Sequence, residues 1–213
     1  MPEKPASATV ARNPLPPKLA ALLREALWLL ALSAALYLFL VLVTYSRSDP
    51  GWSQSVSGPL IRNGGGKVGA YLSDLLLYLF GISAYWWIAF CGVAIVRGIR
   101  NRNPDAPRDR RSIVLTVIGF LVLLLSSSGM EAVRLHTLKA ALPLAPGGVL
   151  GGLVGDALET AFGFTGGTLL LLALFAAGFT LFTGISWLTV IDMVGAGVET
   201  AFAGSIAKWQ ERQ

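Results

Sequence analysis

Charged side chains are scarce in this chain of 213 residues. Asp, Glu, Lys and Arg together make up 14% of it, against about 25% in an average soluble domain, and apolar residues make up 54%. This composition argues against an ordinary soluble domain and against a disordered chain. The chain has one cysteine, Cys91, so an intrachain disulfide and a cysteine-based zinc site are excluded. Its one histidine, His136, lies near Glu131 without an HExxH pattern, which favours a surface histidine over a metal ligand.

Four long windows carry no charge. A bilayer core of about 30 Å is crossed by about 20 apolar residues in a helix. The windows predict membrane spans at about 26–46, 73–96, 112–130 and 168–190. A fifth window, 140–155, has 16 residues and is interrupted by two prolines and five glycines. We interpret the region 140–165 as a re-entrant or interfacial helical segment of the second outer loop. The predicted fold is therefore all-α, an integral membrane four-helix transmembrane bundle.

Lysine and arginine are shared unequally between the two sides of this bundle. Twelve fall on the side of the two termini and five on the other. Because positive residues stay in the cytoplasm, both termini are predicted to be cytoplasmic. Residues 1–24 form a proline-rich tail that we expect to be disordered, and 25–190 form the membrane domain. Residues 191–213 are expected to form a cytoplasmic or interfacial amphipathic helix; the alternative is a plain extension of the fourth span.

The inner connection between the second and third spans is rich in arginine. It carries Arg97, Arg100, Arg102, Arg108, Arg110 and Arg111. We interpret these arginines mainly as a topology signal, and they could also hold anionic lipid head groups. Direct nucleic-acid binding is not favoured, because aromatic and groove-reading residues are absent from this segment.

Asp74 is the one acidic residue at the outer end of a predicted span. Its spacing from Tyr71, Tyr78, Gly81 and Tyr85 places all five residues on one face of an uninterrupted helix. An ionisable residue at this position is a candidate for function. In the structural interpretation, Asp74 reaches outward or pairs with a Tyr hydroxyl or an outer arginine. We predict packing or partner contacts for this stripe.

Glycines recur at every fourth position in the second outer loop, at Gly147, Gly151 and Gly155. On a helix this spacing allows a neighbouring backbone to approach closely. The amphipathic placement of Asp156 and Glu159 favours a short packed helix, and a flexible glycine-rich loop is the alternative. These glycines are further candidates for packing or partner contacts.

No catalytic, cofactor-binding or metal-binding residue is predicted. The serines of the third span have no embedded His or Lys to activate them, so we expect them to bond to backbone carbonyls or neighbouring helices. The run from Gly64 to Lys67 lacks the earlier Gly and the following Ser or Thr of a phosphate-binding loop.

Four segments, taken in order, resemble the N-terminal membrane domain of the FtsK/SpoIIIE-type DNA translocases. They are TYSRSDPGWS (44–53), RNGGGKVGAYLSDLLLYLFGISAYW (62–86), LAPGGVLGGLVG (144–155) and LLLLALFAAGFTLFTGISWL (169–188). The resemblance covers roughly residues 25–190. It implies a bacterial inner-membrane protein with four spans and cytoplasmic ends, enriched at the division septum. In this family the membrane domain anchors a hexameric ATP-driven DNA pump through a long linker.

The resemblance also implies partners: membrane lipids, other divisome membrane proteins and further copies of the chain in a hexamer. The chain carries no Walker motif, so we expect neither catalysis nor a cofactor in this segment. It is expected to be a truncated piece of a longer motor protein or a shorter relative. The first alternative function is a small transporter or channel subunit using Asp74. A membrane enzyme ranks third, because the sequence offers no nucleophile–base pair.

Overall fold

The computed structural model describes residues 16–54, 60–100, 110–135 and 142–210. Its regular elements are α1 (Pro17–Val43), α2 (Gly66–Phe80), the 3-10 helix η1 (Gly81–Tyr85), α3 (Trp86–Arg100), α4 (Arg110–Arg134), α5 (Gly148–Thr183) and α6 (Trp187–Gln210). All regular elements in these residues are helical, so the all-α prediction is confirmed.

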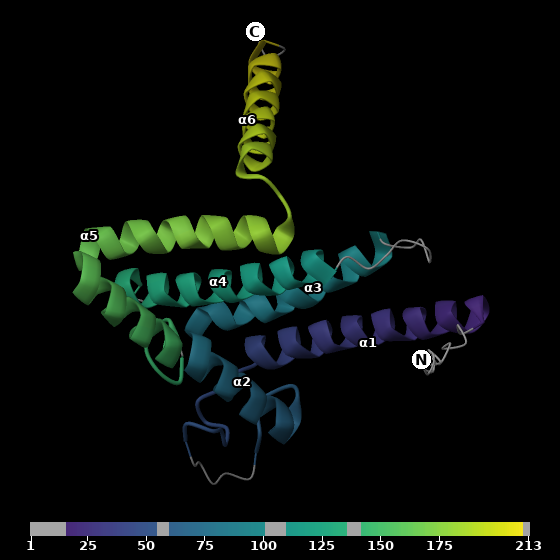
Figure 1. The fold of residues 1–213 in the computed structure, drawn as a ribbon, viewed down its shortest axis with the longest axis vertical. Helices are drawn as coiled ribbons and strands as arrows, with labels where there is room; N and C mark the ends of the chain where they lie inside the picture. Colours follow the sequence, from purple (N-terminus) through teal and green to yellow (C-terminus); the bar gives the residue numbers. More distant parts are fainter. Residues whose placement is uncertain (1–15, 55–59, 101–109, 136–141, 211–213) are drawn as a thin grey trace, which may run out of the picture.

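Four helical stretches are long and apolar enough to cross a membrane. They are Lys18–Val43, Gly66–Arg97, Arg111–Arg134 and Gly148–Thr183. In the bundle α4 packs along α5 and α1 packs along α3 (Figure 1). The predicted four-helix transmembrane bundle is thereby confirmed. At one end of the bundle α2 and the first half of α5 slope away from it, and we call this the loop end (Figure 1). The opposite end, toward which the start of α1 and the end of α5 both point, is the termini end (Figure 1).

The second span is broken, whereas the sequence predicted a continuous helix over 73–96. Helix α2 ends at Phe80, because Gly81 adopts φ 61 and ψ −140, which a residue with a side chain rarely tolerates. Five residues of 3-10 helix follow before α3 starts at Trp86 in a new direction (Figure 1). The average hydropathy of this window does not reveal such a break, because Gly81 is uncharged and lies between apolar residues.

The fourth span also differs from its predicted bounds of 168–190. Helix α5 starts at Gly148 and bends at Gly163, where φ 69 and ψ 171 are not helical. It ends at Thr183, where Gly184 caps it with φ 75. Helix α6 then points away from the bundle (Figure 1), so the interpretation of 191–213 as a plain extension of this span is wrong. Part of the expected re-entrant or interfacial segment is helical, and its membrane placement stays a prediction.

The first span begins earlier than expected. Helix α1 starts at Pro17, whose fixed φ suits the first helical position, so residues 17–24 are helical and not part of a disordered tail. The expected tail of 1–24 was thus drawn too long; residues 1–15 lie outside the described residues. The helix ends at Val43, three residues before the predicted end of this span.

The tightest packing in the bundle lies between α4 and α5. A Cβ atom added at Gly178 would lie 2.6 Å from the backbone nitrogen of Leu123, and one added at Gly119 would lie 2.5 Å from that of Phe182. Both glycines therefore let the two helix backbones nearly touch. Aromatic rings fill the space beside this contact, with the centroids of Phe90 and Phe120 4.6 Å apart.

Candidate functional site: carboxylates at the loop end and an arginine at the termini end

Asp74 is buried in α2 and holds the first outer loop. It is 1% exposed. Its Oδ2 accepts a hydrogen bond from the Ser53 backbone N–H at 2.6 Å, and its Oδ1 accepts from the Ser53 hydroxyl at 2.9 Å and the Tyr45 hydroxyl at 3.3 Å. Gly51 covers the carboxylate so closely that a Cβ atom there would lie 2.5 Å from Asp74 Cγ. These contacts match the structural interpretation of Asp74, with Tyr45 as the tyrosine.

Tyr45 lies in the loop, outside the membrane-spanning stretches. Burial, together with the negative charge of Asp74, raises the pKa of Tyr45 from 10.0 to about 12. The phenol therefore stays protonated and remains a hydrogen-bond donor to Asp74 at neutral pH.

A second buried carboxylate, Asp49, closes the same loop on itself. It is 2% exposed and accepts hydrogen bonds from the backbone N–H groups of Arg62 and Asn63, each at 2.8 Å. The Asn63 side chain then donates to the Val41 carbonyl at 2.9 Å and to the Ser73 hydroxyl at 3.2 Å. The two sides of the loop are thus joined to each other, to the last turn of α1 and to the middle of α2.

Glu131, near the end of α4, joins three elements. It is 6% exposed. Its Oε2 accepts from the backbone N–H groups of Ile82 at 2.9 Å and Gly147 at 3.0 Å, and its Oε1 accepts from the Ser83 hydroxyl. Ile82 lies in the first turn of η1, and Gly147 is the N-cap of α5. Because helix N-termini carry partial positive charge, both helix starts stabilise a carboxylate at this position.

A chain of side-chain hydrogen bonds leads to Glu131. The Trp86 indole N–H donates to the Ser127 hydroxyl at 3.1 Å. The Ser83 hydroxyl has two acceptors within reach, the Ser127 hydroxyl oxygen at 2.7 Å and Glu131 Oε1. The expectation for the serines of the third span is confirmed here, since the Ser128 hydroxyl likewise donates to the Phe80 carbonyl at 3.2 Å.

The predicted glycine stripe lies against α4. Added Cβ atoms at Gly147 and Gly151 would each lie 2.3 Å from the Ser128 carbonyl oxygen, and one at Gly155 would lie 3.0 Å from a methyl carbon of Val133. The structure therefore places all three glycines at a close contact within the chain.

The predicted tyrosine stripe is not a single helical face. That prediction was wrong, because the α-helix ends at Phe80 and Gly81 turns the chain. Asp74 is buried, while Tyr71 is 41% and Tyr85 38% exposed. Tyr85 instead donates to the Leu42 carbonyl of α1 at 3.2 Å, and Tyr78 is half-buried on α2.

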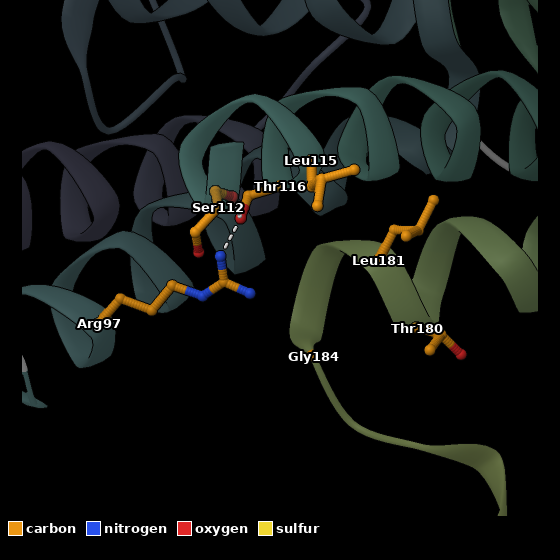
Figure 2. Close-up of a pocket in the computed structure, with 7 residues that line it drawn as sticks. All are labelled: Arg97, Ser112, Leu115, Thr116, Thr180, Leu181 and Gly184. Carbon is orange, nitrogen blue, oxygen red and sulfur yellow. Dashed lines mark hydrogen bonds between the residues drawn. The ribbon is translucent and has the colours of Figure 1, made fainter. Parts of the chain in front are cut away.

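Arg97, one of the six inner arginines, bonds to two other helices. Its Nη1 donates to the Thr116 hydroxyl of α4 (Figure 2). Its Nη2 donates to the Phe182 carbonyl of α5 at 2.9 Å. The others are distributed as follows: Arg111 is exposed at the start of α4, Arg100 and Arg110 lie at ends of α3 and α4, and Arg102 and Arg108 lie outside the described residues.

Sequence reasoning missed Glu131, which was considered only as a neighbour of His136. His136 lies outside the described residues. The available signal was a carboxylate within an otherwise apolar helix, which by itself points to a buried, bonded group. The bonding roles of Asp49 and Asn63 were missed as well. Arg47 was considered as an outer arginine that could pair with Asp74, but it joins the two outer loops by donating from Nε to the Leu142 carbonyl at 2.9 Å.

Comparison with known proteins identifies the family. Residues 20–195 match the model of the 4TM region of DNA translocase FtsK/SpoIIIE. A Ralstonia nicotianae protein named DNA translocase FtsK 2 is 44% identical over 93% of this chain and 26% of its own length. A Shewanella oneidensis DNA translocase FtsK is 39% identical over 76% of this chain and 17% of its own length.

No solved structure matches the chain. The chain spans about a quarter or less of these relatives, and the matched part is their membrane region and not the ATPase motor. The four spanning helices make it a multi-pass membrane protein. The chain belongs to the FtsK/SpoIIIE family of DNA translocases, whose four-helix transmembrane region it contains.

Proposed function

We propose that this chain is the membrane-anchoring and assembly region of a DNA translocase that couples chromosome segregation to division at the septum of a bacterial cell. The observation that carries the proposal is the match of residues 20–195 to the four-transmembrane region of this family. Catalysis would belong to the motor elsewhere in the full-length protein, and we propose neither a cofactor nor direct nucleic-acid binding for this segment.

An anchor of this kind requires the attached motor to lie on the side of the DNA. We propose that both termini are cytoplasmic and that the membrane is the inner membrane. The excess of lysine and arginine on the side of the termini supports this orientation. In Figure 1 α1 runs toward the loop end and the second half of α5 runs away from it, so the start of α1 and the end of α5 point to the same side of the bundle. Tethering motors to one surface raises their local concentration, which favours assembly of a ring.

The loop end supplies a preformed surface for other proteins of the division machinery. Three buried carboxylates, Asp49, Asp74 and Glu131, hold its backbone through hydrogen bonds to peptide N–H groups. A loop held in this way loses little conformational entropy on binding, which favours affinity. We propose that division proteins of the membrane bind this end and that copies of the chain associate as a hexamer.

Localisation in dividing cells tests the proposal. The whole chain, fused to a fluorescent protein, is expressed beside an unrelated four-span membrane protein carrying a second colour. Because a septum contains two membranes, the unrelated protein sets the signal expected from membrane alone. We expect the chain to be enriched at the septum above this control. Equal septal signals for the two proteins would contradict the proposed septal role.

A further inference from the structure

A hollow opens at the termini end of the bundle, between α4 and α5. Its volume is about 290 Å³. It is lined by Arg97, Ser112, Leu115, Thr116, Thr180, Leu181 and Gly184 (Figure 2). The lining combines one cation and three hydroxyls with two leucines and contains no carboxylate. It therefore presents a polar, positively charged part next to an apolar part.

The Arg97 guanidinium is held in place at this hollow. Its bonds to the Thr116 hydroxyl and the Phe182 carbonyl fix it between α4 and α5. Thr116 is oriented in turn, because its hydroxyl donates to the Ser112 carbonyl at 2.7 Å. A guanidinium has five N–H donors, and these contacts use two of them. The cation is thus preorganised and retains donor capacity toward the hollow.

Ser112 adds a donor beside this cation. It lies in the first turn of α4, and its hydroxyl points toward the Arg97 guanidinium (Figure 2). The start of a helix favours an anion through its dipole and its free N–H groups. The end of α5 has the opposite effect, but Arg97 already bonds to its Phe182 carbonyl. The Arg97 cation and the start of α4 together therefore favour an anion. Because a guanidinium has several N–H donors, it suits an anion with several acceptor oxygens.

We propose that this hollow binds the phosphate of an anionic phospholipid. Arg97 and Ser112 donate to the phosphate oxygens, and an acyl chain lies along Leu115 and Leu181, which are 49% and 40% exposed. The position of the hollow, at the ends of two spanning stretches, favours a lipid over a free anion. Arg97 ends the second spanning stretch and Arg111 begins the third, so the hollow lies at the head-group layer. A single site of this kind differs from a diffuse attraction of anionic lipids to all six inner arginines. It adds specific lipid binding to the anchoring role proposed above.

Lipid titration of the purified chain in a neutral detergent tests this site. Native mass spectrometry counts bound phosphatidylglycerol, with phosphatidylcholine and inorganic phosphate in separate arms. We expect saturable binding of phosphatidylglycerol, weaker binding of phosphatidylcholine and no competition by inorganic phosphate at equal concentration. Because a hydrogen bond to a charged group is lost, Arg97→Gln is expected to weaken binding at least about tenfold. Arg110→Gln, which removes the same charge from the inner connection, should change it less than about threefold.

A second variant separates binding from folding. Ser112→Leu fills the hollow and removes one donor, while both partners of Arg97 remain. It should retain the thermal unfolding temperature of the unmodified chain in lipid-free detergent and still bind phosphatidylglycerol at least about tenfold more weakly. Unchanged affinity in Ser112→Leu would overturn the proposal. So would equal losses in Arg97→Gln and Arg110→Gln, which indicate diffuse charge, or full competition by inorganic phosphate, which indicates a free-anion site.

Discussion

Removing the carboxylate of Glu131 should uncouple the loop end from the bundle. Glu131→Ala leaves the N–H groups of Ile82 and Gly147 without their acceptor. The site is buried, since the Glu131 side chain that fills it is 6% exposed. An unsatisfied buried donor costs about 1–3 kcal/mol, so the two together cost about 2–6 kcal/mol. The Ser83 hydroxyl adds little to this cost, because it can rotate to Ser127 at 2.7 Å.

The amide variant sharpens this prediction. In Glu131→Gln the amide oxygen can accept from both N–H groups, while the amide nitrogen donates to Ser83. Only the charge assistance is lost, so we expect a cost of about 1–2 kcal/mol. Glu159→Ala, an exposed change in the first half of α5, is the control and should lie within about 0.5 kcal/mol of the unmodified chain.

Two measurements check this ordering of Ala, Gln and control variants. Unfolding in mixed micelles of denaturing and mild detergent gives the change in unfolding free energy, and hydrogen exchange reports the amides of Ile82 and Gly147 directly. We expect both amides to lose protection in Glu131→Ala while amides of α4 near Leu123 keep theirs. If Glu131→Ala unfolds at the same detergent fraction as Glu159→Ala, the assignment of Glu131 as the junction of α4, η1 and α5 is wrong.

Three further changes test other contacts. Gly178→Ala should cost about 1–3 kcal/mol in the same unfolding assay, because its Cβ would lie 2.6 Å from the Leu123 nitrogen. Gly92→Ala, whose Cβ would meet no atom within 4 Å beyond its chain neighbours and the backbone of its own helix, should be neutral or stabilising. Asp74→Ala should cost about 2–4 kcal/mol and make the first outer loop sensitive to protease, and unchanged proteolysis would contradict its role. Because the folded-state pKa of Tyr45 is raised from 10.0 to about 12, folding stability should fall as the pH rises through that range. Tyr45→Phe should reduce this loss of stability. An identical pH profile in the variant would refute the link between Tyr45 ionisation and folding.

The membrane spans could be predicted from the sequence because burying a charge in lipid is costly, so charge-free windows such as 112–130 mark them directly. The breaks within the spans could not be predicted in this way. Gly81, Gly163 and Gly184 all adopt positive φ, at 61, 69 and 75, yet each is one glycine among 24 and hydropathy does not distinguish them. Only the packing around each glycine decides which of them turns the chain.

The role of Glu131 illustrates a second limit. Its partners are backbone N–H groups of Ile82 and Gly147, which lie 49 and 16 residues away in sequence. A peptide N–H is present at nearly every position, so no residue type signals the pairing. Asp74, in contrast, was singled out by its position at the end of a span, although its actual partners, Tyr45 and Ser53, lie in the loop.

The central claim is that four helices cross the membrane and leave both ends of the chain in the cytoplasm. Reporter fusions to the whole chain test it most directly, with a fluorescent protein that matures in the cytoplasm and a phosphatase that is active only outside it. The account predicts that each terminus gives fluorescence and no phosphatase activity, whereas a phosphatase inserted after Trp52 in the first outer loop is active. Phosphatase activity at either terminus would contradict it.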